Sequence, residues 1–417
     1  MLDAQEVLSE LNFERLAGSP GEKKALELIG GYLKKLHLEY QLEPFQLNSF
    51  DTGNAQIKLG EKVYPAHPFG LTQATNVQGD LIFLENAKVI FHNRSAYRGK
   101  IIISKNYSRK YQQYLLAGEV KAFILIGKPF REAHSISVRQ KKFAEGFVPA
   151  VVVDYDVGAE LSKFSGQSVT LHINQHAEKR TAHNLVVNIS GKKTDENLII
   201  SCAHYDTVAR SPGITDNGGG VVALLKIAEY FSNHPPSRDL RLVWFSGEEL
   251  GLLGSYDYVQ KHLAEIKNRL MMVLNIDVAG DDLGVNEMVV MGTRELLGYV
   301  SGIAREKGVY FNAGLNIYSS DGVPFSVYEI PSVNLGRYGG KTSFRIHTSG
   351  DNPEYISSRG LEPIISSAVN ILNRCLNAEV FPFVPEIDAE LKEKLEKYLW
   401  QSTFNPPHLH WTPHYMK

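Results

Sequence analysis

From residue 184 onward, the sequence alternates short, almost wholly apolar runs with segments of helical periodicity. The apolar runs cover residues 185–189, 198–203, 240–245, 271–276 and 287–291. The helical segments cover residues 219–231, 250–259, 296–307 and 359–376. Strands that lack a polar face are buried on both sides, which requires helices on each face of their sheet. We therefore predict an α/β domain in which a mixed β-sheet is sandwiched between helices.

The first half of the chain differs in character. A helical period covers residues 20–36 and a strand-like run covers 39–47, whereas residues 51–183 are dominated by short β-rich runs. These runs cover residues 81–84, 88–91, 100–103, 122–126 and 150–153, with one helical pattern at 111–118. Residues 51–183 carry no acidic or histidine motif of the metal-binding kind. We predict one discontinuous domain from 1–50 and 184–385, an inserted β-rich domain from 51–183, and a helical and aromatic tail from 386–417.

Composition excludes several classes of protein. The chain has 417 residues, which is enough for more than one domain, and a formal net charge of −2 with mixed signs, so we expect no nucleic-acid partner. The start lacks a basic region and an apolar core, and no run reaches the ~18 apolar residues of a membrane span, so we expect no signal peptide and no membrane. With only two cysteines, Cys202 and Cys375, we expect a cytoplasmic protein without a structural disulfide.

Metal-binding residue types follow the predicted strands directly. Two adjacent carboxylates end the run at 240–245, and burying both is costly unless a cation or a proton neutralises them. In open α/β sheets, ligands bind at the carboxyl ends of strands, where all these residues are expected to meet. Imidazole and carboxylate groups suit a pair of zinc ions, although they also serve cobalt and manganese. The candidate metal ligands are His204, Asp216, Glu249, Asp277 and His347.

Physical roles can be assigned to several of these residues. Asp206 is placed to accept the His204 ring N–H that faces away from the metal, which would fix the tautomer. The two oxygens of Asp216 could bridge ions held ~3.5–4 Å apart. Glu248 would act as the general base on a water between two zinc ions. The glycines at 218–220 let the backbone pass close to the site, and no lysine follows them as a phosphate-binding loop requires.

At these spacings, the residues resemble the co-catalytic zinc aminopeptidases, a family that includes aminopeptidase Y and the glutamate carboxypeptidases. The resemblance spans about residues 10–50 and 184–376. It implies that His204 and Asp277 hold one zinc, that Glu249 and His347 hold the other, and that Asp216 binds both. It also implies catalytic roles for Glu248 and Asp206. The insertion resembles the protease-associated domain of many members.

The sequence departs from the family at the substrate side. The segment 320–325 resembles a loop that reads Ser-Asp-His in relatives, but Gly322 replaces the histidine. Several relatives carry an oxyanion-binding tyrosine immediately before the last histidine ligand, where this chain has Ile346. Tyr318 and Tyr338 are candidate replacements, with partly buried packing as the alternative reading. The tail histidines are interpreted as solvated side chains of an aromatic tail that docks on its own surface or on a second subunit, consistent with a homodimer: His408, His410 and His414.

The resulting functional prediction is a dizinc metallo-exopeptidase, an aminopeptidase that hydrolyses N-terminal residues of peptides. One alternative is a glutaminyl-peptide cyclotransferase, which resembles this chain but uses a single zinc. Carboxypeptidase or dipeptidase action on the same fold is another, because specificity lies in the pocket loops. A non-catalytic receptor-like homologue is disfavoured, because such a protein would be expected to have lost ligands and none is missing.

Overall fold

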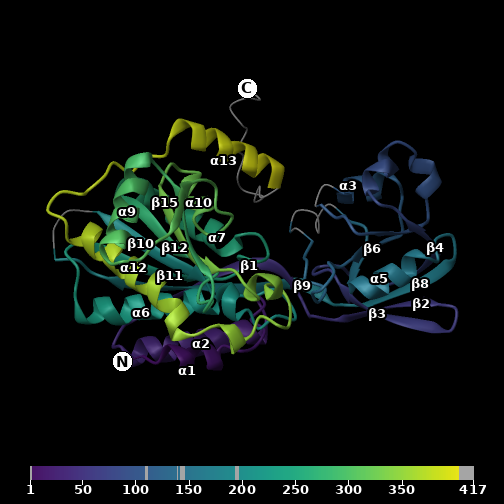
Figure 1. Cartoon of the computed structure of the whole chain (residues 1–417), viewed down its shortest axis with the longest axis horizontal. Helices are drawn as coiled ribbons and strands as arrows, with labels where there is room; N and C mark the ends of the chain where they lie inside the picture. The colour runs from purple at the N-terminus through teal and green to yellow at the C-terminus, as the bar shows by residue number, and fades with distance from the viewer. Residues whose placement is uncertain (1, 109–110, 139, 141–145, 193–196, 403–417) are drawn as a thin grey trace.

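The computed structural model describes residues 2–108, 111–138, 140, 146–192 and 197–402. Within this part of the chain, eight strands form a central sheet in the order β1-β9-β11-β10-β12-β15-β13-β14 (Figure 1). Their bounds are β1 (Gln41–Phe50), β9 (Ala177–Ile189), β11 (Asp239–Phe245), β10 (Leu198–His204), β12 (Leu270–Ile276), β15 (Ser332–Tyr338), β13 (Val285–Met291) and β14 (Asn312–Leu315). The sheet is mixed, because β9 and β13 run antiparallel to their neighbours β11 and β15.

The middle of the sheet is parallel and fully buried. β10 pairs with β11 on one side and with β12 on the other, and each of its residues is buried. The sequence predicted these strands to within a residue or two. It did not predict β15. Burial of Asn334 in that strand is tolerated because its side-chain polar atoms have partners. Its Nδ2 donates to Oγ of Ser332, and its Oδ1 accepts from Nδ2 of Asn275.

Helices cover both faces of the sheet, as predicted. One hydrophobic core lies between the sheet and the helices α1 (Ala4–Glu10), α2 (Pro20–Lys35), α6 (Gly219–Asn233), α9 (Arg294–Glu306) and α12 (Ser358–Asn377). The other face packs against α7 (Leu253–Lys261), α8 (Leu263–Arg269), α10 (Val323–Ser326) and α13 (Ala389–Ser402). This arrangement confirms the predicted fold class.

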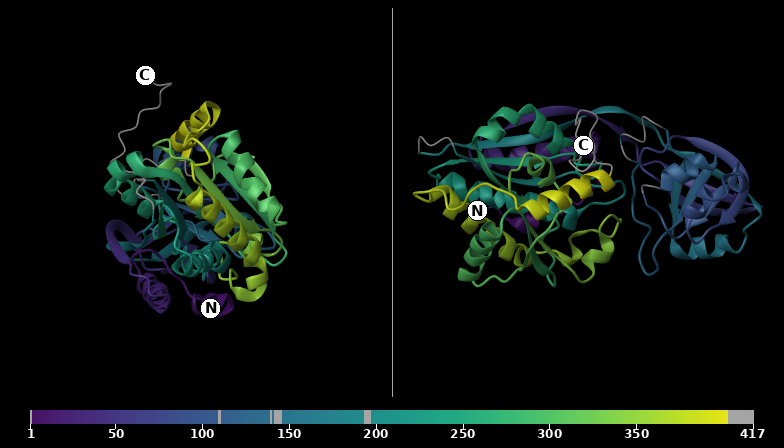
Figure 2. Two further views of the ribbon diagram at one scale, coloured as in Figure 1. Left: turned by 90° about the vertical axis from the view of Figure 1, so that its left-hand side faces the viewer. Right: turned by 90° about the horizontal axis from the view of Figure 1, so that it is seen from above.

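The inserted region forms a closed barrel at one end of the elongated molecule (Figures 1 and 2). Its strands, in barrel order, are β2 (Asn54–Leu59), β3 (Lys62–Pro68), β7 (Ala150–Val153), β6 (Ala122–Ile126), β5 (Ile101–Ser104), β4 (Thr75–Phe83) and β8 (Ser168–Asn174). Helical pieces flank them: η1 (Ala87–Phe91), η2 (Arg94–Tyr97), α3 (Tyr111–Ala117) and α5 (Tyr155–Ser162). The expected strand at 88–91 is wrong: it is a 3₁₀ turn whose start is capped by the Asn86 side chain.

Two long strands connect the barrel to the central sheet. β1 and β9 pair antiparallel from Gln41 opposite Val186 to Phe50 opposite Ala177. The chain enters the barrel after β1 and returns from it along β9, which runs without interruption through residue 183. The division of the chain into domains at 50/51 and 183/184 stays a prediction.

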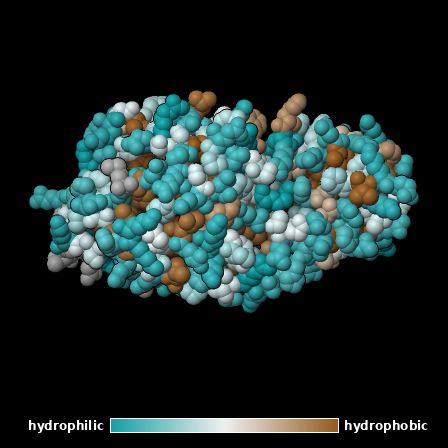
Figure 3. All heavy atoms as spheres, turned by 90° about the horizontal axis from the view of Figure 1, so that it is seen from below, coloured by the Kyte–Doolittle hydropathy of each residue, from teal (hydrophilic) through white to brown (hydrophobic). Residues whose placement is uncertain are grey.

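The C-terminal helix α13 packs its leucines against the loop before α10 and against α7. The tail histidines at 408, 410 and 414 lie outside the described residues. In the described part of the chain, no helix combines the length and apolarity needed to cross a membrane. On the face shown in Figure 3, hydrophobic residues are scattered among hydrophilic ones. Cys202 and Cys375 are both buried and unpaired.

Candidate metal centre

Three neighbouring parallel strands bring metal-binding side chains to one edge of the sheet. His204 is the last residue of β10, and Asp277 directly follows β12. Glu248 and Glu249 lie in the turn after β11. Because these three strands are adjacent and parallel, their carboxyl ends gather the four side chains in one place.

Asp216 and His347 reach the same place from loops. Asp216 lies in the turn η3 (Ile214–Gly218), directly before α6. The carboxylate of Asp351 holds this turn by accepting the amide of Asp216 at 3.1 Å and the preceding amide at 2.7 Å. His347 follows α11 (Thr342–Arg345) with a left-handed φ of 64°. Such backbone is uncommon outside glycine and clusters at functional sites.

The glycines after Asp216 permit close packing behind the site. A Cβ on Gly219 would lie 2.1 Å from the backbone oxygen of Ala279, and one on Gly220 would lie 2.3 Å from Oδ1 of Asn217. A side chain at either position would push the start of α6 away from the loop that follows β12. Gly219 and Gly220 therefore have the role of close backbone approach that the sequence predicted, whereas a Cβ on Gly218 would lie no nearer than 3.4 Å to other atoms.

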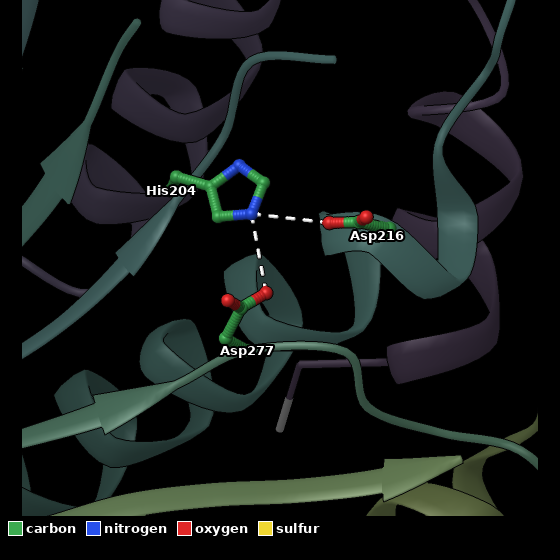
Figure 4. Close-up of side chains that lie close together, drawn as sticks. All are labelled: His204, Asp216 and Asp277. Atoms are coloured by element: carbon green, nitrogen blue, oxygen red, sulfur yellow. Dashed lines mark hydrogen bonds and ion pairs between the residues drawn. The ribbon is translucent and has the colours of Figure 1, made fainter. Parts of the chain in front are cut away.

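The candidate ligands form two groups that share Asp216. Figure 4 shows the first group, in which Nε2 of His204 lies 3.1 Å from Oδ1 of Asp216 and 3.2 Å from Oδ1 of Asp277. In the second group, Nε2 of His347 lies 3.1 Å from Oδ2 of Asp216 and 3.2 Å from Oε2 of Glu249. Within each group, the ligand atoms all lie within 4.8 Å of one another. Asp216 thus directs one oxygen to each group, as a bridging carboxylate must.

The donor chemistry fits a pair of divalent cations. Each group offers one imidazole nitrogen and carboxylate oxygens, which is a typical zinc-binding set. Oε1 of Glu249 is buried and has no hydrogen-bond partner among the described residues. An unpaired buried carboxylate oxygen is costly, and a bound cation would remove that cost.

The ionisation of these groups is coupled to their burial. Although burial opposes the charged imidazole, neighbouring carboxylates raise the pKa of His204 and of His347 well above its ordinary value. Burial also opposes ionisation of Asp216, but hydrogen bonds from both histidines outweigh it and lower the pKa of that carboxyl. Burial raises the pKa of Glu248 well above its ordinary value, and raises that of Glu249. In the absence of a metal, protons therefore partly neutralise the cluster.

Asp206 supports the glutamate pair as well as His204. Its carboxylate accepts the backbone amides of Glu248 at 3.2 Å and Glu249 at 3.4 Å. Nδ1 of His204 lies 3.2 Å from the main-chain oxygen of Asp206 and 3.6 Å from its carboxylate. The hydrogen bond that orients the ring is therefore made by the main chain of Asp206. The side chain fixes the turn that presents Glu248 and Glu249.

Sequence comparison assigns this domain to a family. Residues 184–371, which carry all the candidate ligands, match peptidase family M28. This match covers the larger part of the discontinuous domain that the sequence predicts. The match confirms the predicted resemblance to this group of metallopeptidases, and the chain is a metallopeptidase. The likeness of the inserted barrel to a protease-associated domain stays a prediction.

Several known peptidases resemble the chain over most of its length. It is 28% identical to aminopeptidase YwaD of Bacillus subtilis over 378 residues, which cover 85% of this chain and 80% of that protein. The solved zinc aminopeptidase BSAP from Bacillus subtilis superposes with a TM-score of 0.75 at 22% identity, covering 93% of this chain and 98% of the other. A peptidase M28 precursor from Shewanella amazonensis gives a TM-score of 0.78 at 19% identity, with 92% and 95% coverage. The fold of this chain is therefore shared by peptidases along almost its whole length.

The predicted substrate-side residues lie at the first ligand group. The hydroxyl of Tyr318 donates to the main-chain oxygen of Asp277 at 3.1 Å, and Tyr338 is half-buried at the end of β15. Asp321 accepts from Ser255 at 2.6 Å through Oδ1, and its buried Oδ2 has no hydrogen-bond partner among the described residues. Burial raises the pKa of Asp321 to about 7.

The sequence did not reveal that the inserted barrel reaches the metal centre. A pocket of about 220 Å³ is lined by the candidate ligands Glu249 and His347 together with residues 134–138 of the barrel domain. His134 is half-buried there, and burial together with the nearby Arg131 lowers its pKa to about 4. A lone histidine in a β-rich insertion carries no sequence signal for such a position.

Arg15 is a second residue that the sequence did not reveal. Its fully buried guanidinium lies behind the two ligand loops and donates to main-chain oxygens of both. Nε donates to Tyr205 at 2.7 Å, and Nη2 donates to Gly213 at 2.8 Å. Burial lowers the pKa of Arg15 to about 10, against the opposing influence of nearby carboxylates. Arg15 thus holds the segment after His204 and the segment before Asp216 in one arrangement.

Proposed function

We propose that this metallopeptidase is a dizinc aminopeptidase. The observation that carries the proposal is the pair of ligand groups that share Asp216, each with one histidine and one further carboxylate. In this proposal, His204 and Asp277 hold one zinc, Glu249 and His347 hold the other, and Asp216 binds both. The names of the relatives give independent support, because one is called an aminopeptidase and another a zinc aminopeptidase.

Glu248 is the general base of the proposed reaction. Bound zinc supplies Lewis-acid polarisation of the scissile carbonyl and lowers the pKa of water. Glu248 takes a proton from the attacking water, whose oxygen bonds to the carbonyl carbon. It then delivers that proton to the leaving nitrogen as the carbon–nitrogen bond breaks. Burial raises the pKa of the Glu248 carboxyl in the metal-free protein, so this group binds a proton more readily than an exposed glutamate does.

The positions of Asp206 and Asp277 fit this scheme. Asp206 fixes the amides on both sides of the Glu248 side chain and so limits its movement. We propose that the free amine of the substrate binds near Glu248 and Asp277, whose main-chain oxygen accepts the hydroxyl of Tyr318. Glu248, which holds no zinc in this proposal, is the carboxylate that would attract a positively charged α-amine and repel a substrate carboxylate. This charge argument favours N-terminal over C-terminal cleavage.

A single-zinc cyclotransferase is the main competing function on this fold. It needs only one ligand group, whereas this chain retains two complete groups around Asp216. Carboxypeptidase and dipeptidase actions share the proposed metal site and differ in what the substrate pocket binds. The homodimer, the cytoplasmic location and the identity of the metal as zinc rather than cobalt or manganese remain predictions.

Peptide substrates with free and blocked ends separate these functions. Aminoacyl chromogenic substrates and tripeptides should be hydrolysed, N-acetylated tripeptides should resist, and tripeptides with an amidated C-terminus should still be cleaved. A chelator should abolish the activity, and added zinc should restore it. Cleavage of N-acetylated but not of C-amidated peptides would show a carboxypeptidase instead. Conversion of N-terminal glutamine to a pyroglutamyl residue that stays on the peptide, with release of ammonia and one zinc per chain, would show a cyclase.

A further inference from the structure

The 131–138 loop of the inserted barrel is rigidly held on its own domain. This loop lies between β6 and β7. The amide of Ala133 donates to Oδ1 of Asp154 at 2.9 Å, and the amide of Val138 donates to the main-chain oxygen of Gly70 at 2.8 Å. Ala133 and Val138 are buried in a hydrophobic cluster to which the peptidase domain also contributes. The loop is therefore an ordered element with a fixed direction.

The same loop is docked on the backbone of a metal-ligand segment. The amide of Ser135 donates to the main-chain oxygen of His347 at 2.9 Å. Nη2 of Arg131 donates to the main-chain oxygen of Ile346 at 2.8 Å, and Ser349 donates through its hydroxyl to Glu132 at 2.6 Å. The loop residues that make these contacts lie on both sides of His134 in the sequence. They fix its position relative to His347.

A second ligand-bearing segment holds the other side of the loop. Ser135 donates through its hydroxyl to the main-chain oxygen of Ala209, and Nη2 of Arg210 donates to that of Ala133 at 3.2 Å. Residues 207–210 lie between His204 and Asp216 in the sequence. The loop therefore joins the two segments that carry three of the ligands, and the pocket of about 220 Å³ lies beneath it.

His134 lines this pocket and carries a polar atom that is not used elsewhere. Its Nδ1 is buried, and no described protein group forms a hydrogen bond with it. Leaving such an atom unpaired costs free energy, so a partner from the substrate would be favoured. The hydroxyl of Tyr318 already donates to the main-chain oxygen of Asp277. The side chain before His347 is the apolar Ile346, which cannot donate.

We propose that His134 is a catalytic residue supplied by the inserted domain, which donates a hydrogen bond to the scissile carbonyl oxygen as negative charge develops on it. The proposal rests on the proposed peptidase function and deepens it. An imidazole has at least one N–H donor in either protonation state. A donor fixed before the reaction stabilises the developing charge without reorganisation, which is the role of an oxyanion hole. The inserted barrel then completes the active site instead of only covering it.

Kinetics of two His134 variants test this role on the full-length, zinc-loaded protein. His134→Leu removes the donor, and we expect kcat to fall by roughly 10²–10³-fold with KM nearly unchanged, as for loss of one oxyanion donor. His134→Gln retains an N–H and should recover part of that loss. His172, an exposed histidine on β8 of the same barrel, provides the matched control, and His172→Leu should leave both constants unchanged.

Binding measurements supply a readout that does not depend on turnover. By calorimetry, His134→Leu should weaken a tetrahedral phosphonate analogue of the substrate by about tenfold or more, but leave the affinity for the product amino acid unchanged. Zinc content and thermal unfolding temperature should match those of the wild type. A kcat of His134→Leu within about threefold of the wild-type value would overturn the proposal, and so would a change confined to KM. Equal losses in both variants, accompanied by lower thermal stability or zinc content, would show a structural role and overturn it as well. If the zinc-loaded wild type itself fails to hydrolyse peptides, the proposed function fails instead.

Discussion

Replacing Arg15 by methionine should destabilise the peptidase domain and loosen both ligand loops. Arg15 is fully buried, and methionine preserves much of its aliphatic volume while removing every donor. The guanidinium donates to five main-chain oxygens. Their acceptors and distances are Tyr205 (2.7 Å), Leu11 (2.7 Å), Phe13 (3.1 Å), Pro212 (2.5 Å) and Gly213 (2.8 Å).

The magnitude follows from the unpaired oxygens. Each buried acceptor that loses its partner costs about 1–3 kcal/mol. Removing the buried charge offsets several kcal/mol of this cost, because burial of the guanidinium is itself unfavourable. The pKa of Arg15, lowered to about 10, reflects the same desolvation. We therefore expect a net loss of about 3–5 kcal/mol in the free energy of unfolding.

Urea unfolding of the metal-free protein, followed by tryptophan fluorescence, measures this loss without the contribution of bound metal. Arg359→Met is the matched control, because the Arg359 side chain is 78% exposed and should cost less than about 0.5 kcal/mol. Arg15→Lys, which keeps a charge but only three donors on one nitrogen, should fall between the two. If Arg15→Met lies within about 1 kcal/mol of the wild type, the hydrogen bonds to the loops do not contribute as argued.

Three further predictions concern the metal centre and its surroundings. Asp206→Asn should lower kcat about 10–100-fold with zinc retained, because the turn that holds the glutamates loosens; unchanged kinetics would contradict the positioning role. Gly322→Ala should cost about 1–3 kcal/mol in urea unfolding, because its Cβ would lie 2.2 Å from Oγ of Ser332; wild-type stability would show that the loop adapts freely. Zinc affinity, measured by chelator competition, should rise from about pH 6 to about pH 8. Carboxylates raise the pKa of His204 and His347 in the metal-free protein despite burial, so zinc must displace protons that are lost as the pH rises; a constant affinity would refute this coupling.

The sequence was most informative for segments whose local residue pattern directly reflects their position in the fold. The apolar runs that became β10, β11 and β12 are recognisable because each is buried on both faces. Their carboxyl ends carry His204, Asp277 and the two glutamates, so the sheet rule alone was enough to predict that these side chains meet. The grouping of the candidate ligands around Asp216 agrees with the resemblance.

The sequence was least informative where long-range contacts decide the outcome. β15 was missed because Asn334 and Arg337 interrupt its apolar pattern, and the buried Asn334 is tolerated only because of partners on other strands. The run at 88–91 was predicted as a strand because a short apolar run is compatible with either a strand or a helical turn. In the structure it is a 3₁₀ turn, whose start is capped by the side chain of Asn86. His134 and Arg15 have no local signal, because their roles come from contacts roughly two hundred residues away.

The central claim is that Glu248 is the base at a centre of two metal ions. The direct test is to measure the zinc content and kcat of Glu248→Gln beside the wild type, on an aminoacyl chromogenic substrate. We predict two zinc ions per chain in both proteins and a fall in kcat of roughly 10³-fold or more, since the base is lost while the ligands are intact. Wild-type turnover by Glu248→Gln with two zinc ions bound, or a single zinc ion in the active wild type, would contradict the account.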